Sequence, residues 1–186
     1  MKSSDAARLM KAIFDYLPVQ KFLDEYPEFS ERMVYELRDQ VAELLQTQSL
    51  QEERSFSLFV DGASQPQKKQ AGIGGVIYLN DSEIESFSEN IGEATNNEAE
   101  YQALIRGCQV IRKFKPERVY IFADSELLVK QITGEYQVKN PRMQTLCGKA
   151  MNVLQHLPEW RIEHVPRERN KRADQLSKQA VLQGEA

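Results

Sequence analysis

Two asparagines, Asn96 and Asn97, directly precede a pair of carboxylates at the point where an apolar helical pattern begins. Glu100 falls in the first turn of that helix, and Leu104 and Cys108 repeat along the side that is expected to be buried. A carboxylate beside a buried helix face is costly unless a basic group or a metal ion pairs with it. The stretch therefore predicts a partner for Glu100 from elsewhere in the chain.

Three further carboxylates stand where predicted elements begin or end. Asp61 ends an alternating strand pattern and Asp174 opens the last helix. Asp124 ends the continuous apolar run 119–123, which is expected to form a strand buried on both faces. Open α/β sheets place their sites at strand ends, where helices begin. We therefore expect these three side chains to converge with Glu100 at one edge of the sheet.

Four carboxylates at close range would raise one another's pKa steeply unless cations share the site. The chain has only two histidines and two cysteines, and they form no cluster for a soft metal. An all-oxygen site suits Mg²⁺ or Mn²⁺. Two such ions roughly 3.5–4 Å apart would clamp the attacking and leaving oxygens of a phosphodiester displacement.

Four motifs, in this order, resemble type 1 ribonuclease H, in the variant often described as reverse transcriptase-like. The resemblance covers about residues 55–182, and the first 54 residues lie outside it. The motifs are Asp61-Gly62, then Thr95-Asn96-Asn97 with Glu100-Tyr101, then Ala123-Asp124-Ser125, then His164-Val165-Pro166-Arg167-Glu168 with Asn170, Ala173-Asp174 and Leu176.

The resemblance implies a catalytic, metal-binding role for Asp61, Glu100, Asp124 and Asp174, with two Mg²⁺ or Mn²⁺ ions per site. It also implies that His164 is a catalytic loop histidine that assists proton transfer or product release. The alternative for this histidine is a strand-end residue that is hydrogen-bonded to the turn after it. The implied activity is hydrolysis of the RNA strand of RNA/DNA hybrids.

The resemblance further implies that Asn96 and Asn97 read the RNA strand in the minor groove, where RNA presents its 2′-hydroxyl. Thr95, Gly62 and Asn170 are the other candidate substrate-binding residues, Thr95 as a possible phosphate contact. Glu98, which is not a catalytic position of the family, is expected to be solvated. Four basic side chains are either phosphate contacts or solvated loop charges, namely Lys68, Lys69, Lys139 and Arg142.

Some members of the family carry a basic, tryptophan-rich protrusion after the helix that follows the third acid. Here the segment from Gly134 to Met143 is short, and the single tryptophan, Trp160, falls in a predicted strand. This departure, with the chain's near-neutral main part, leaves two other functions open. One is a non-catalytic binding or regulatory protein that kept the fold; the other is a nuclease for a different structured nucleic acid.

The order of the strands and helices that must position these residues predicts an α/β fold, with a five-stranded mixed sheet and helices on both faces. The resemblance implies that this fold is ribonuclease H-like. The glycine-rich strand 71–79 indicates a close backbone approach or a bulge; a dinucleotide site is the alternative, but the GxGxxG spacing is absent. The expected strands are 56–61, 71–79, 83–90, 119–123 and 160–165, and the expected helices are 96–112, 126–134, 143–157 and one from 172, with a hairpin turn at 80–81.

Residues 1–54 are predicted to form a helical N-terminal extension, and residues 55–186 the ribonuclease H-like domain. Pro18 ends or kinks the first helical run, Ser30 is a candidate N-cap, and Gln46–Glu53 is a candidate polar joint. The extension holds 7 Lys/Arg and 11 Asp/Glu (7 − 11 = −4), whereas the rest holds 17 of each (17 − 17 = 0). Two hypotheses remain for residues 1–50. They pack on themselves or on the main domain, or they bind a protein partner or a second copy of the chain.

The bulk properties favour a cytoplasmic protein. Cys108 and Cys147 both fall in predicted helices, so reduced core thiols are expected rather than a disulfide framework. The first residues reach an acid at once, and no uncharged apolar run is long enough to span a membrane. We therefore expect neither a signal peptide nor contact with a membrane.

Overall fold

The computed structural model describes residues 3–16, 18–52 and 55–184 of the 186-residue chain. The chain divides into two compact units, Met1–Arg54 and Ser55–Ala186. Each unit is described by itself below. No helix among the described residues is long and apolar enough to cross a membrane.

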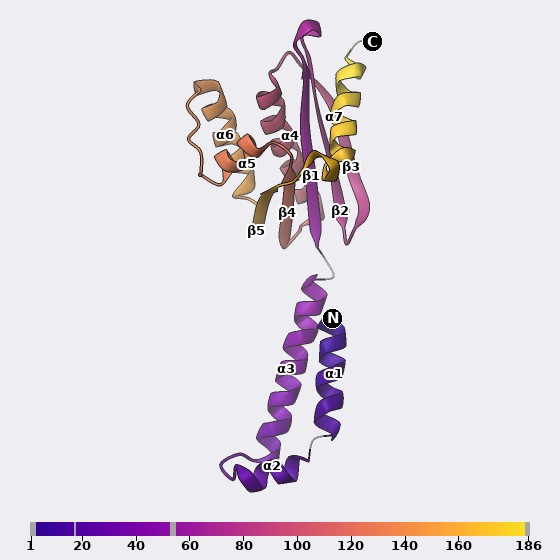
Figure 1. The fold of residues 1–186 in the computed structure, drawn as a ribbon, viewed down its shortest axis with the longest axis vertical. Coiled ribbons are helices and arrows are strands. Elements are labelled where there is room, and N and C mark those ends of the chain that lie inside the picture. Colours follow the sequence, from indigo (N-terminus) through magenta and orange to yellow (C-terminus); the bar gives the residue numbers. More distant parts are fainter. Residues whose placement is uncertain (1–2, 17, 53–54, 185–186) are drawn as a thin grey trace. The chain divides into compact units, whose positions relative to one another are not determined.

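The N-terminal unit consists of three helices (Figure 1): α1 (Ser3–Tyr16), α2 (Val19–Glu25) and α3 (Glu31–Glu52). As predicted, Ser30 caps α3, because its Oγ accepts the N–H of Met33 at 3.3 Å. The candidate polar joint at Gln46–Glu53 is helical in its described part, since α3 continues to Glu52.

The second unit is built on a five-stranded mixed sheet, which confirms the predicted fold class. Its strands are β1 (Phe56–Gln65), β2 (Gln70–Leu79), β3 (Ser82–Gly92), β4 (Arg118–Ala123) and β5 (Glu159–His164), in the order β3-β2-β1-β4-β5. The first three form an antiparallel meander, whereas β4 pairs in parallel with β1 and β5 in parallel with β4. The meander turns at Asn80 and Asp81, which both have positive φ, as a tight hairpin requires.

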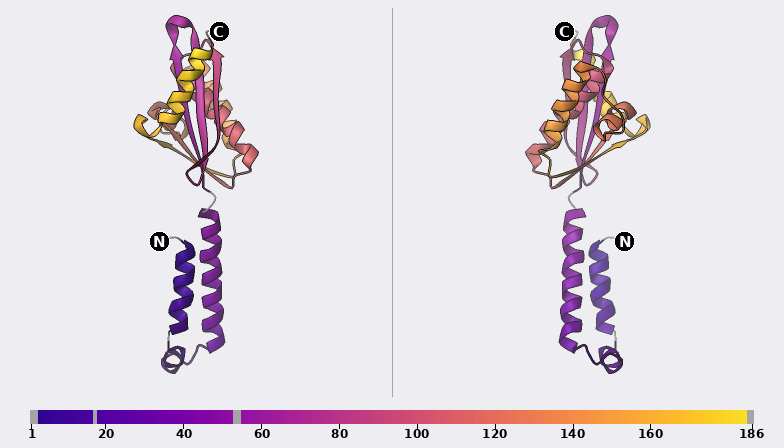
Figure 2. Two further views of the ribbon diagram at one scale, coloured as in Figure 1. Left: turned by 90° about the vertical axis from the view of Figure 1, so that its right-hand side faces the viewer. Right: turned by 90° about the vertical axis from the view of Figure 1, so that its left-hand side faces the viewer.

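Helices cover both faces of the sheet, as Figures 1 and 2 show. On one face lie α4 (Asn96–Ile111), α5 (Glu126–Ile132) and α6 (Pro141–Leu154), and on the other lies α7 (Lys171–Gln183). Three short 3₁₀ turns complete the unit, at Pro66–Lys68, Arg112–Phe114 and Arg167–Arg169.

The glycines of β2 allow α7 to lie directly on the strand. A Cβ on Gly74 would come within 2.3 Å of the Ser177 amide nitrogen, and one on Gly72 within 2.5 Å of the Ser177 carbonyl oxygen. The predicted close backbone approach is therefore confirmed, and the helix that a dinucleotide fingerprint needs does not follow β2. This contact brings α7 over β1 at the level of Asp61, because Asp61 pairs with Gly74.

The prediction that β4 is buried on both faces is wrong. Val119, Ile121 and Ala123 are fully buried beneath the helices, but Tyr120 and Phe122 on the opposite face are only partly buried. A single helix covers that opposite face, and it packs on β1, β2 and β3 rather than on β4. The apolar run therefore predicted the strand correctly, but the burial of its second face was predicted to be greater than it is.

Candidate active site

Three of the predicted acids meet at the point where β1, β4 and α4 come together. Asp124 follows the last residue of β4, and Glu100 lies in the first turns of α4, both as expected. Asp61, however, does not end its strand, because β1 continues for four residues to Gln65. It reaches the site because the shorter, parallel β4 ends beside it: Val60 pairs with Ala123, the residue before Asp124.

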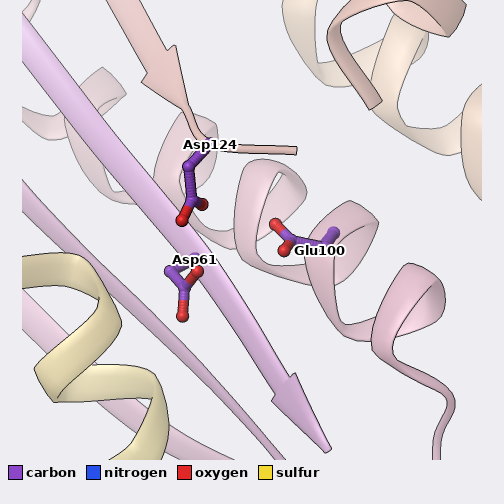
Figure 3. Close-up of side chains that lie close together, drawn as sticks. All are labelled: Asp61, Glu100 and Asp124. Carbon is purple, nitrogen blue, oxygen red and sulfur yellow. The ribbon is translucent and has the colours of Figure 1, made fainter. Parts of the chain in front are cut away.

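The carboxylates of Asp61, Glu100 and Asp124 point toward one another (Figure 3). One oxygen from each lies within 4.8 Å of those of the other two. Asp61 and Glu100 are each only 5% exposed. The trio lines an open cleft of about 570 Å³, and Arg167 and Lys178 line the same cleft.

Two side chains from the C-terminal part hold the aspartates in place. Asn170, which is 1% exposed, donates from Nδ2 to the carbonyl oxygen of Val60 at 2.9 Å and to Oδ1 of Asp124 at 3.0 Å. Ser177 donates its hydroxyl hydrogen to Oδ2 of Asp61. The turn before α7 and the helix itself therefore fix the two aspartates against β1 and β4.

Without a bound cation, the cluster disfavours negative charge on its carboxylates. Burial, followed by repulsion from Asp61 and Asp124, raises the pKa of Glu100 to about 9. Burial likewise raises the pKa of Asp61 to about 7, against the hydrogen bond from Ser177 and with the help of the charge on Asp124. A cation bound among the three carboxylates would reverse both shifts, because it stabilises their charged forms.

Glu100 supplies a direct test of whether the site fits a metal ion. Its Oε2 is buried and has no hydrogen-bond partner among the described residues, while its carboxylate accepts the N–H of Gly62. A buried carboxylate oxygen without a partner is a costly arrangement unless something else binds it. Since the donor set is all carboxylate oxygen, the trio fits a hard divalent cation.

Gly62 lets α4 approach β1 closely enough to bring Glu100 into the cluster. A Cβ at this position would lie 2.3 Å from the amide nitrogen of Glu100 and 2.4 Å from the carbonyl carbon of Ala99. Both are backbone atoms, so no side chain can move aside. The Asp-Gly pair therefore combines a carboxylate with the space that its companion needs.

Replacing Gly62 by alanine is expected to destabilise the second unit by about 1–3 kcal/mol, because α4 must move away from β1. Chemical denaturation followed by circular dichroism measures this loss. Gly148→Ala is the matched control, since nothing lies within 4 Å of a Cβ there and the glycine is inside a helix. Equal stability of Gly62→Ala and the unchanged chain would contradict the close approach.

Asp174, the fourth predicted acid, lies outside the group of three. It opens α7 as expected, but its carboxylate is bound by Nε of Arg167 at 3.0 Å and by Nζ of Lys178 at 2.7 Å. Burial alone would raise its pKa, yet these two cations outweigh burial and hold the pKa of Asp174 below its ordinary value. Asp174 is therefore ionised and adjacent to the cluster, with its charge balanced by side chains.

Glu98 corrects a prediction. It is 7% exposed rather than solvated, and it forms a capping box with Thr95 at the start of α4. Its Oε2 accepts the Thr95 N–H at 2.9 Å, and Nη2 of Arg142 lies 3.1 Å from its Oε1. The Thr95 backbone hydrogen bond, with Arg142, lowers the pKa of Glu98. Arg142 and the Thr95 hydroxyl thus both have partners in this structure.

The remaining candidates are exposed side chains of the second unit. Asn96 lines it, and Asn96 and Asn97 are both exposed in the first turn of α4. His164 is exposed at the end of β5, where it pairs with Ala123. Lys69, in the connection between β1 and β2, approaches Glu93 at 3.9 Å.

A match to a family model decides the assignment. Residues 59–180 match the model described as reverse transcriptase-like, and this range contains Asp61, Glu100, Asp124 and Asp174. The chain belongs to the ribonuclease H family, in its reverse transcriptase-like form. The predicted resemblance is confirmed.

Two relatives illustrate how far this ribonuclease H family membership extends. A "Ribonuclease HI" of Halobacterium salinarum is 36% identical over 124 residues, which is 66% of this chain and 62% of the relative. The "Bifunctional protein Rv2228c" of Mycobacterium tuberculosis is 34% identical over 123 residues, which is 65% of this chain and 34% of that protein. The chain therefore spans less than two thirds of the length of these relatives.

Solved structures of the ribonuclease H family match the second unit closely. The crystal structure of RNase H1 from Halobacterium salinarum superposes with a TM-score of 0.67 and 33% identity, and covers 69% of this chain and 98% of that one. A structure of LC11-RNase H1 in complex with an RNA/DNA hybrid gives a TM-score of 0.66 and 34% identity, and covers 70% and 99%.

Sequence reasoning missed two side chains that surround the acids in this ribonuclease H fold. Ser177 binds Asp61, and Lys178 binds Asp174. The spacing from Asp174 to these residues is three and four positions, which places all three side chains on the same side of α7. That spacing could have been read from the sequence once Asp174 was chosen.

Proposed function

We propose that the chain is a metal-dependent endonuclease that hydrolyses the RNA strand of RNA/DNA hybrids. The observation that carries the proposal is the cluster of Asp61, Glu100 and Asp124, which has an unpartnered buried oxygen and opens into a cleft. The ribonuclease H relatives and the neighbour solved with an RNA/DNA hybrid support the choice of substrate. We also propose a cytoplasmic location, which the two free cysteines support.

In this proposal Asp61, Glu100 and Asp124 hold two Mg²⁺ or Mn²⁺ ions, and Asp174 contributes from the edge of the cluster. When bound there, such ions would supply an activated water for attack on phosphorus and would neutralise the charge that develops on the departing oxygen. As the water oxygen bonds to phosphorus, the bond between phosphorus and the 3′ oxygen would break. The 3′ oxygen would take up a proton, which leaves a 3′-hydroxyl and a 5′-phosphate. Asn170 and Ser177 keep two of the carboxylates oriented while the charge at the site changes.

The rim of the cleft supplies the proposed substrate contacts. Asn96 and Asn97 present amides that can bind the 2′-hydroxyl and the base edges of the minor groove. Gly62 lines the cleft beside Asn96. In this proposal Thr95 contacts a phosphate, Asn170 acts by holding Asp124, and His164 assists proton transfer or product release. Arg167 and Lys178 line the same cleft and are positioned to face an entering phosphate.

Cleavage of a hybrid with end-labelled RNA tests the proposal. We expect the RNA strand to be cut internally with Mg²⁺ or Mn²⁺, and the DNA strand, duplex DNA and double-stranded RNA to remain intact. Excess chelator should stop the reaction, and added divalent ion should restore it. Cutting of duplex DNA, or of both strands of the hybrid, would contradict the assigned substrate.

A non-catalytic, nucleic-acid-binding role is the second candidate. The ion pairs of Asp174 with Arg167 and Lys178 favour it, because they already balance the charge of one predicted metal ligand. Calorimetric titration with Mg²⁺ and Mn²⁺ separates the two functions. Binding of divalent ions together with cleavage supports the nuclease, whereas no binding at millimolar concentration supports the second role.

A further inference from the structure

The N-terminal unit leaves most of its large apolar side chains exposed. Ala42 is the only buried residue among those of its side chains that the structure describes. Seven of its large apolar residues are 41–66% exposed, and they are Leu9, Ile13, Phe22, Phe29, Met33, Leu37 and Leu44. A helical unit of about this size without a buried core of its own is not stable in water unless another surface covers it.

The exposed residues form one stripe on each long helix. On α1, Leu9, Ile13 and the 91% exposed Tyr16 follow at intervals of four and three residues. On α3, Met33 and Leu37 are four residues apart, and Leu44 is two turns further along. These intervals place each stripe along one side of its helix.

Both stripes lie on the same side of the α1–α3 hairpin. The two helices run side by side in opposite directions (Figures 1 and 2). Met10 and Phe14 mark the part of α1 that packs on α3, and Val41 and Ala42 mark the part of α3 that packs on α1. Viewed from the N-terminus of its own helix, each stripe is rotated away from that contact in the same direction. Because the two helices are antiparallel, both stripes therefore lie on the same side of the hairpin.

A groove at the α2 end of the hairpin supports this placement. It has a volume of about 650 Å³ and is lined by residues of all three helices, among them Phe14, Phe22, Met33 and Leu37. Met33 and Leu37 belong both to the α3 stripe and to the groove. We call the two stripes and the groove together the hairpin face.

We propose that the hairpin face binds the same face of a second copy, so that two chains form a four-helix bundle through α1 and α3. Two antiparallel helices with apolar stripes on one side are half of such a bundle, and a two-fold axis completes it with identical contacts. A second copy is present wherever the chain is made, so it can cover a face that cannot stay exposed.

The available area agrees with a dimer. Aromatic side chains bury roughly 150–250 Å² each and large aliphatic ones somewhat less, so seven such residues at about half exposure offer on the order of 600 Å² of apolar surface per copy. A standard interface buries about 800 Å² per partner, part of it polar. The polar neighbours of the stripes on α1 and α3 would supply the remainder.

Light scattering coupled to size exclusion tests the proposal on the full chain. The chain has a mass of 21.4 kDa, so a dimer has 2 × 21.4 = 42.8 kDa. We expect the dimer mass at micromolar concentration, and a shift to the monomer mass for Leu37→Glu, because a charge is then buried in the bundle. Ile84→Glu is the matched control, since Ile84 is 36% exposed on β3 in the second unit, and it should remain dimeric.

Leu37→Glu could also unfold the hairpin, so Leu37→Ala and a dilution series of the unchanged chain accompany it. We expect Leu37→Ala to dissociate at a concentration at least tenfold higher than the unchanged chain does, with loss of helical circular dichroism on dissociation. A monomeric chain at all concentrations with full helical content would overturn the proposal. So would a dimer that persists in both Leu37 variants, since the contact then lies elsewhere.

Discussion

Asp124→Asn is expected to reduce cleavage of the RNA strand by at least about 10³-fold while the chain stays folded. A bound divalent ion contributes several kcal/mol of charge stabilisation in the transition state, and each 1.36 kcal/mol is a factor of ten in rate. The amide removes one of three carboxylates that lie within 4.8 Å of one another. It keeps an oxygen that can still accept the hydrogen bond from Asn170.

Single-turnover cleavage with saturating Mg²⁺ measures the rate, and thermal unfolding shows that the fold is intact. Glu126→Gln is the matched control, because it is also a carboxylate-to-amide change, two residues further along the chain. Glu126 is exposed and paired with Lys130 at 2.6 Å rather than with the cluster. We expect its rate to stay within about twofold. A rate for Asp124→Asn within tenfold of the unchanged chain would place the activity at other residues.

The acids of the site could be predicted because each one violates a local rule. A carboxylate at the edge of a buried helix face or after an apolar strand needs a partner, and this need is visible at Glu100 and Asp124 without any structure. Asp61 was found for a partly wrong reason. The sequence placed it at a strand end, whereas the strand continues past it and the neighbouring strand ends beside it.

Contacts between distant segments could not be predicted in the same way. Glu98 has the same chemistry as Glu100, and nothing in its residue type shows that Arg142, 44 positions away, pairs with it. Whether a strand is covered on its second face depends on where α7 packs, which Gly72 and Gly74 decide. Such arrangements depend on the assembled sheet rather than on local pattern.

Glu100→Gln is expected to stabilise the metal-free second unit at pH 8 by about 2 kcal/mol or more, although it abolishes cleavage. Without a metal ion the pKa of Glu100 is raised to about 9 from an ordinary value of 4.5. The folded chain therefore keeps a proton that the unfolded chain releases, so stability falls as the pH rises from about 4.5 toward 9. The neutral amide avoids this loss, and at pH 5 the two proteins should be equally stable.

Thermal unfolding of the second unit at pH 5 and pH 8, with chelator and with Mg²⁺, measures these differences. Mg²⁺ should raise the unfolding temperature of the unchanged chain at pH 8 and should raise that of Glu100→Gln much less, because the ion binds the charged cluster. If Glu100→Gln were less stable than the unchanged chain at pH 8 with chelator, the buried carboxylate would be favourable by itself. The argument for a metal site would then fail.

Glu98→Gln, in the same turn of α4, should respond with the opposite sign. The pKa of Glu98 is lowered, chiefly by the Thr95 backbone hydrogen bond, so its charge stabilises the fold above the ordinary value of 4.5. That contribution is lost as the pH falls through the folded pKa, so this variant should lose about 1 kcal/mol at pH 8 and less at low pH. Glu98 and Glu100 are two positions apart in the chain, yet the pH dependence of their variants distinguishes them. The charge of Glu98 stabilises the fold by itself, whereas the charge of Glu100 requires a bound metal ion.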